Sequence, residues 1–291
     1  MAITSGAIKV LITEAKRKPF SGSLLTLGRQ SVFVSQSAFH KIAEDLAFPL
    51  SSIPQSDKRP LNDSGIGDDV LFRSLGFDQV VTTDNDDFES ADVIFDLNSS
   101  GPPPELLNRF DVILDCGTLE HIFDLPNALN NICRMLKTGG RVIHISPSSN
   151  HIDHGFYMFS PTLFFDFYSA NHFEINTIQV IRYTQIHDLC PRLSPWLAMD
   201  YKPGSLGYFA IGGLDDGAYS VHVVTTKTEQ STGNTIPQQG YFVRAWSGAT
   251  PALSRLSIFF SRHPRLKAIV KTIYIALKPK RKAPLNVVAR Y

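Results

Sequence analysis

Short apolar runs alternate with amphipathic segments along the first two thirds of the chain. Two later segments, 175–183 and 219–226, alternate between polar and apolar residues and contain many β-branched ones, which predicts two strands. Five earlier runs are short and mainly apolar, as strands covered on both faces are, and they span residues 24–27, 80–83, 93–95, 112–114 and 142–145.

Helical patterns separate most of these runs. The clearest helix is expected over 126–137, with Asp124 as its N-cap and Gly139 and Gly140 ending it. Further helices are expected over 32–47 and near 68–75. Strands alternating with helices predict an α/β fold: a doubly wound, mostly parallel, seven-stranded Rossmann-like sheet with helices on both faces. Ligand crevices in such sheets lie at the carboxyl ends of the strands.

Charge and composition divide the chain into a body and a tail. All 27 acidic residues lie at or before Glu229, whereas 11 of the 28 basic residues lie after position 239. We therefore expect an α/β domain over 1–230, with an insertion at about 48–67 and a Pro/Gly-rich excursion at about 184–217. The domain is expected to be followed by a linker over 231–240 and a basic amphipathic helical appendage over 241–291.

The tail pattern leaves several partners open. An apolar face edged by cations suits an anionic membrane surface, and it also suits docking onto the acidic body or another subunit, which is the favoured interpretation. A nucleic-acid partner is not expected, because no recognition motif appears. The oligomeric state is not predicted.

Composition sets limits on class and compartment. Hydrophobic residues make up 43% of the chain and charged residues 19%, which is typical of a globular protein. No apolar run approaches a membrane span. Cys116, Cys133 and Cys190 lack a CxxC spacing, so neither a disulfide framework nor a thiolate zinc site is expected. We expect a cytoplasmic protein, with a peripheral position on the inner face of the membrane as the further option.

Three residues follow the first three strands where a nucleotide-like ligand would lie. Gly28 would let a ligand approach the backbone, Asp84 is placed to accept hydrogen bonds from ribose hydroxyls, and Asp96 from an adenine amino group. Each has a simpler alternative, because a lone glycine is a weak signal and turn aspartates commonly cap helices or turns.

The most specific motifs begin at the fourth strand. Residues 110–122 read F-D-V-I-L-D-C-G-T-L-E-H-I, 136–140 read L-K-T-G-G, and 159–163 read F-S-P-T-L. Over about residues 20–183 the chain resembles the class I S-adenosylmethionine-dependent methyltransferases.

The resemblance implies a cofactor site and a reaction. Gly28 would lie against the methionine portion of S-adenosylmethionine, Asp84 at the ribose and Asp96 near the adenine, while Cys116 and Gly117 line the sulfonium side. The chain departs from the family after the first strand, where Leu-Gly-Arg-Gln replaces an acidic residue and several glycines, and where the connection to Asp84 is unusually long.

The segment after the fifth strand is dense in imidazole, hydroxyl and aromatic groups. Methyl transfer to a hydroxyl needs a base, and a histidine suits that role at neutral pH. We expect His151 or His154 as the base and Asp153 as the residue that orients it. Further residues expected to form the acceptor pocket are Tyr157, Phe159, Glu120, His121 and His144. For Glu120 and His121, ordering of the local turn is the slightly favoured alternative.

A metal site and two other functions are less favoured. His151, Asp153 and His154 with His144 or His121 would offer metal ligands, but HxDH is not a standard zinc spacing, so no metal ion is expected. The sequence favours methylation of a small-molecule or glycan-type acceptor, with O-methylation preferred. The alternative is a catalytically degenerate methyltransferase-like binding protein. A nucleotide-sugar or dinucleotide enzyme ranks last, because no GxGxxG follows the first strand.

Overall fold

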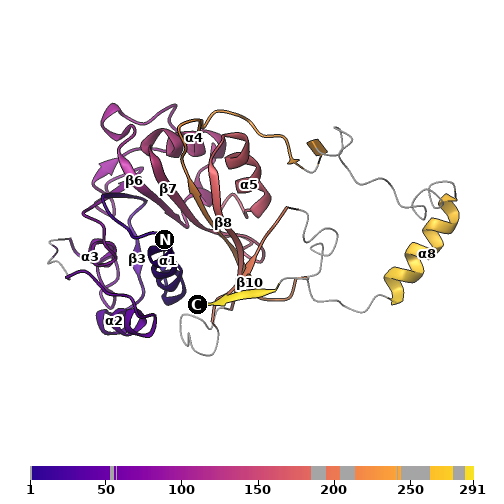
Figure 1. Cartoon of the computed structure of the whole chain (residues 1–291), viewed down its shortest axis with the longest axis horizontal. Helices are drawn as coiled ribbons and strands as arrows, with labels where there is room; N and C mark the ends of the chain where they lie inside the picture. The colour runs from indigo at the N-terminus through magenta and orange to yellow at the C-terminus, as the bar shows by residue number, and fades with distance from the viewer. Residues whose placement is uncertain are drawn as a thin grey trace.

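The computed structural model describes residues 2–52, 56, 58–184, 195–203, 214–240, 242–243, 263–277 and 286–291. Its centre is a nine-stranded sheet in the order β11-β9-β8-β10-β7-β6-β2-β4-β5 (Figure 1). The strands are β2 Ser23–Leu27, β4 Gln79–Asp84, β5 Val93–Ile94, β6 Phe110–Cys116, β7 Leu136–Pro147, β8 Glu174–Tyr183, β9 Leu197–Asp200, β10 Ala218–Thr226 and β11 Val287–Arg290. A two-stranded parallel pair joins β1 Ala2–Ile3 to β3 Ser31–Val32.

Helices cover both faces of the sheet (Figure 1). They are α1 Ser5–Arg17, α2 Gln36–Asp45 and α3 Asp68–Ser74 on one side, and α4 Leu125–Met135 and α5 Pro161–Ala170 on the other. Neighbouring strand residues alternate between the two hydrophobic cores: Leu24 packs with the first group and Leu25 with the second. This alternation explains the mainly apolar runs, since both faces of each central strand are buried.

The predicted strands and two of the helices are confirmed. All seven segments predicted as strands belong to the main sheet. The α3 helix occupies 68–74, and α4 follows its N-cap Asp124, whose side chain accepts a hydrogen bond from Asn127 N. The α4 helix ends at Met135, before the expected stop at Gly139 and Gly140, because the chain enters β7 at Leu136. The helix expected over 32–47 is shorter, because β3 holds residues 31–32 and the N-cap at Ser35 starts α2 at Gln36.

The sheet is larger and less parallel than expected. The pairs β5–β4, β4–β2, β2–β6 and β6–β7 are parallel. The pairs β7–β10, β10–β8, β8–β9 and β9–β11 are antiparallel. The additional strands β9 and β11 extend the edge beyond β8. Residues 287–290 are therefore strand, not helix, because they pair with β9 and the buried side chain of Tyr291 anchors their end.

The insertion at 48–67 is tied to the body where it is described. Lys58 Nζ lies 2.6 Å from Asp92 Oδ1, and Ile66 N donates to Val34 O at 3.1 Å. The segment predicted as a linker also contacts the domain, because Thr235 N donates to Asn171 Oδ1 and Gly240 N to Asp166 Oδ2, both at 3.0 Å.

The tail contains one described helix, α8 Pro264–Leu277, which lies away from the sheet (Figure 1). Leu266, Ile269, Val270 and Ile273 are exposed on it. Its membrane or docking role and the domain boundaries stay predictions, and parts of the 184–217 excursion and of 241–291 lie outside the described residues. Within the described part of the chain, no helix is long and apolar enough to cross a membrane.

Candidate active site

The chain order places a crevice between β2 and β6. From β2 the chain proceeds to β4 and β5 on one side and then returns to β6 on the other. Loops at the carboxyl ends of these strands therefore diverge, as at the ligand crevices of open α/β sheets. Glycines with left-handed backbone follow both strands, Gly28 (φ 74°) and Gly117 (φ 85°). Two cavities open at this edge.

The first, which we call the cofactor cavity, has a volume of about 440 Å³. It brings together Gly28, Asp84 and Asp96, three residues far apart in sequence. One oxygen of Asp84 accepts the Asn85 N–H at 2.8 Å, so the other oxygen is available to a ribose hydroxyl. Asp96 Oδ1 instead accepts from Asn98 N and Nδ2, both at 2.8 Å, which matches its simpler role in ordering a turn. The volume and the acceptor oxygens of Asp84 fit a nucleoside cofactor.

The loop after β2 is shaped by a buried ion pair instead of further glycines. Arg29 is 3% exposed and forms a two-pronged contact with Asp68, with Nε–Oδ2 at 3.0 Å and Nη2–Oδ1 at 2.9 Å. The pKa of Arg29 is raised by this hydrogen bond. Its remaining donors reach the carbonyls of Glu89 and Arg59. Arg29, which stands where the methyltransferase pattern has glycines, therefore holds the loop against α3 and the insertion.

The second, the acceptor cavity, has a volume of about 490 Å³ and adjoins the first. His121 lines both cavities. Cys116 and Gly117, expected on the sulfonium side of the cofactor, line this cavity and not the cofactor cavity. Burial raises the pKa of the Cys116 thiol, which favours its protonated form. The other lining residues are Thr4, Ser31, Phe33, Glu120, Ile145, Pro147, His151, His154, Tyr183, Trp196 and Ser220.

Asp115, at the end of β6, organises the turn between the cavities. Its Oδ1 accepts from Thr118 N at 3.1 Å and Leu119 N at 3.2 Å, and its Oδ2 contacts Ser146 Oγ at 2.9 Å and His144 Nδ1 at 2.8 Å. His144 was expected in the acceptor pocket and is not there. It is fully buried, with Nε2 2.7 Å from Tyr168 Oη, because β7 directs it into the core.

Glu120 follows on the short 3-10 helix Leu119–His121 and is completely buried. Burial, reinforced by the nearby Asp115 charge, raises the pKa of its carboxyl group to about 8. Its Oε1 lies 3.4 Å from His154 Nε2 and 3.9 Å from His121 Nε2. Burial and His154 lower the pKa of His121.

His151 lines the acceptor cavity, half-buried, with Nε2 2.9 Å from Tyr183 Oη. Burial, then His154, lowers its pKa, so the neutral imidazole is favoured. Asp153 does not orient it: the Asp153 side chain is exposed on a left-handed backbone (φ 70°), and no hydrogen bond joins it to either histidine among the described residues. The side chain that contacts the His151 imidazole is Tyr183.

Two expected wall residues lie behind the cavity instead of lining it. Phe159 is 3% exposed and packs in the core with Phe164. Tyr157 stacks on Phe159 and donates its hydroxyl to Phe123 O at 2.7 Å. Both follow the sharp return of the chain after β7, where aromatic side chains cover the sheet. They support the loop that carries the histidines.

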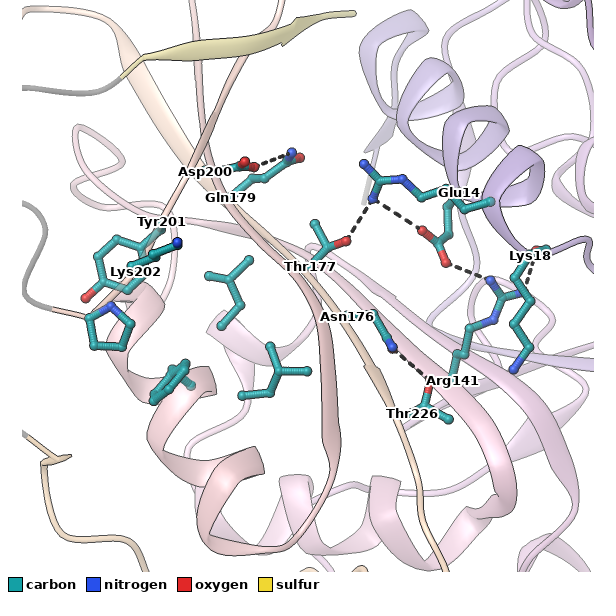
Figure 2. A pocket seen from close by; sticks show the side chains of 15 residues that line it. Glu14, Lys18, Arg141, Asn176, Thr177, Gln179, Asp200, Tyr201, Lys202 and Thr226 are labelled. Atoms are coloured by element: carbon teal, nitrogen blue, oxygen red, sulfur yellow. Dashed lines mark hydrogen bonds and ion pairs between the residues drawn. The ribbon is translucent and has the colours of Figure 1, made fainter.

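A third cavity of about 600 Å³ lies at the opposite edge of the sheet, where β7 and β8 begin (Figure 2). Its polar side chains pair with one another: Glu14 with Arg141 at 2.7 Å, Arg17 with Thr177 at 2.8 Å, and Gln179 with Asp200 at 3.0 Å. The first two contacts join α1 to the sheet and the third joins β8 to β9, which is a structural role.

The structure adds functional candidates that the sequence did not single out. Asp115 stands inside the recognised motif, and its position at the strand end was the available signal. Tyr183, Trp196 and Ser220 come from three separate segments, and no local pattern indicates that they meet. Trp196 stacks on Tyr183 at 5.2 Å between ring centroids and is fixed by two backbone hydrogen bonds to Tyr291.

Comparison with known proteins bears on these cavities. A family model described as a methyltransferase domain matches residues 73–162, which include Asp84, Asp96, Glu120 and His154. No curated protein matches the chain.

Solved structures similar to the chain share little sequence with it. A possible histamine N-methyltransferase from Thermotoga maritima is 17% identical, with a TM-score of 0.37, covering 77% of this chain and 90% of its own. Phosphoethanolamine N-methyltransferase 2 of Haemonchus contortus, in complex with S-adenosyl-L-methionine, is 12% identical, with a TM-score of 0.39, covering 76% of this chain and 52% of its own.

The match takes in β4, β5, β6 and β7 and the turn that carries Glu120, so one side of the crevice at the β2–β6 switch lies in a segment similar to a methyltransferase domain. S-adenosylmethionine, the cofactor expected from the sequence resemblance, carries an electrophilic methyl group on sulfur.

Proposed function

We propose that the protein transfers the methyl group of S-adenosylmethionine to a hydroxyl oxygen of a small molecule or glycan bound in the acceptor cavity. The observation that carries the proposal is the adjacency of the two cavities, which share His121. A cofactor held by Gly28 and Asp84 would face an acceptor beside His151. Methyl transfer requires this in-line approach, so positioning supplies much of the rate.

The acceptor cavity supports a hydroxyl as the nucleophile. Its polar side chains, Ser31, Tyr183, Ser220 and His151, can hydrogen-bond hydroxyl groups, while Phe33 and Trp196 offer apolar surface. A hydroxyl is a poor nucleophile until its proton leaves. An acceptor hydroxyl that takes the place of the Tyr183 hydroxyl at His151 Nε2 would lose its proton to that nitrogen. We therefore assign His151 as the base and leave Asp153 without a role.

His151→Ala tests this assignment. Turnover with a hydroxyl-bearing acceptor is expected to fall by about 10²- to 10⁴-fold, because the base is lost. Affinity for S-adenosylhomocysteine should stay near the wild-type value, since His151 does not line the cofactor cavity. Transfer of labelled methyl groups to panels of hydroxyl and amine acceptors provides the measurement.

Asp153→Ala is the matched control, because Asp153 is exposed two residues away on the same loop, and its turnover should equal that of the wild type. Full turnover in His151→Ala, or transfer to amines in preference to hydroxyls, would refute the proposal.

A further inference from the structure

Glu120 is an unusual group for the floor of a cavity. Its side chain is fully buried, yet neither carboxylate oxygen has a hydrogen-bond partner among the described residues. A buried carboxylate without partners is costly unless a proton or a cation compensates it. Both carboxylate oxygens of the neighbouring Asp115, in contrast, have partners: Oδ1 accepts from two backbone N–H groups of the turn, and Oδ2 contacts His144 and Ser146 of β7.

Two imidazole nitrogens face the same carboxylate oxygen. One possible ligand atom from each of Glu120, His121 and His154 lies within 4.8 Å of the other two. Glu120 Oε1 itself is 3.4 Å from His154 Nε2 and 3.9 Å from His121 Nε2. Ligand atoms about 2.1 Å from a tetrahedral ion lie roughly 3.4 Å apart. The Glu120–His154 separation of 3.4 Å already has this value, and the 3.9 Å to His121 needs only a small side-chain rotation.

The backbone holds the three residues in this arrangement. Phe156 N and Tyr157 N both donate to Glu120 O, at 2.7 and 3.2 Å, so the loop carrying His154 is fastened to the turn carrying Glu120. Gly155 permits the contact, because a Cβ there would lie 2.8 Å from Glu120 O. His121 adjoins Glu120 in the chain. The donor set is thus preorganised without an ion.

We propose that Glu120, His121 and His154 bind one divalent first-row transition-metal ion, such as Zn²⁺, at the boundary of the cofactor and acceptor cavities. Two imidazoles and one carboxylate favour such an ion over Mg²⁺ or Ca²⁺, which prefer oxygen ligands. Three protein ligands leave coordination positions open, as in catalytic metal sites. The His121 and His154 side chains line the acceptor cavity and are 47% and 52% exposed, so a ligand in the cavity could reach the open positions.

This donor set differs from the one considered from sequence spacing. His144 is buried in the core and Asp153 points to solvent, so neither joins it. Glu120 and His154 are brought together only by the return of the chain after β7. If the proposed methyl transfer holds, and this step rests on it, the ion binds the acceptor oxygen and orients it toward the methyl group.

The test is metal binding by the full-length, tag-free protein after removal of bound ions with a chelator. Zn²⁺ is titrated by calorimetry, and Co²⁺ by its visible absorption. We expect one equivalent per chain, with affinity reduced at least about tenfold in both Glu120→Gln and His154→Ala. His40→Ala is the control, because His40 is an exposed histidine on α2, and its affinity should be unchanged.

Three results would overturn the site: no stoichiometric binding by the wild type, wild-type affinity in both ligand variants, or an equal loss in His40→Ala, which indicates adventitious surface binding. If Glu120→Gln does not fold, His154→Ala decides alone, because that side chain is half exposed. S-adenosylhomocysteine titration of the same samples separates the two proposals. Metal binding without cofactor binding would contradict the methyl-transfer account only, and the reverse would contradict the metal site only.

Discussion

His222, in the middle of β10, is the clearest case of a titratable group buried for structural reasons. It is 2% exposed, its Nδ1 contacts Gln179 Oε1 at 3.2 Å, and its Nε2 has no partner in the described part of the chain. Burial, with smaller contributions from Arg17 and His144, lowers the pKa of His222 to about 3. The folded protein therefore keeps this imidazole neutral.

This lowered pKa predicts a loss of stability in mild acid. Below about pH 6.5 the unfolded chain binds a proton at His222 that the folded chain does not, so the stabilisation is complete above that pH and is lost progressively toward pH 3. Between pH 7.5 and 5.5 the wild type should lose about 1.4 kcal/mol more than His222→Gln, measured by urea unfolding. The same pH dependence in both proteins would show that His222 is not neutral when folded.

At the scale of elements, the buried pair between Arg29 and Asp68 connects the cofactor loop to the start of α3. Both side chains are at most 3% exposed, and Asp68 also accepts Gln30 N at 3.2 Å. Removing one partner of a buried pair leaves the other charge uncompensated, which is far more damaging than loss of a surface pair. This loop lacks the acidic residue and the glycines of the methyltransferase pattern, and the buried Arg29–Asp68 pair orders its backbone instead.

Asp68→Ala should therefore lower the free energy of unfolding by about 3–5 kcal/mol. Asp45→Ala is the matched control, because the Lys41–Asp45 pair is exposed on both sides and should cost no more than about 0.5 kcal/mol. Urea midpoints of the two variants provide the comparison. Similar losses in both would mean that the Arg29–Asp68 pair does not stabilise the loop.

The elements themselves were predictable to different degrees. Central strands such as β6 were recognisable because both faces are buried, and α4 because Asp124 caps it. The helix α1 was not predicted, since its N-cap Thr4 makes no side-chain cap hydrogen bond. The short edge strands β9 and β11 also escaped, because four-residue strands with mixed burial leave little pattern.

At the scale of the whole molecule, the cofactor cavity could be predicted from the sequence, whereas the acceptor cavity could not. Gly28, Asp84 and Asp96 were expected at the cofactor cavity because each follows a strand, and parallel strands end at one edge. The acceptor cavity depends on tertiary contacts instead. Trp196 is positioned by Tyr291, so the last residue of the chain helps to fix a wall of this cavity. His144 was misplaced because alternation along β7 turns it into the core.

The cofactor cavity is the central claim, and calorimetric titration with S-adenosylmethionine and S-adenosylhomocysteine tests it most directly. The account predicts micromolar binding of both ligands, about 8 kcal/mol, and at least about tenfold weaker binding by Asp84→Ala, which loses the carboxylate proposed to hold the ribose. Absence of binding by the folded wild type would contradict the account. It would favour a methyltransferase-like binding protein whose Arg29 loop no longer admits the cofactor.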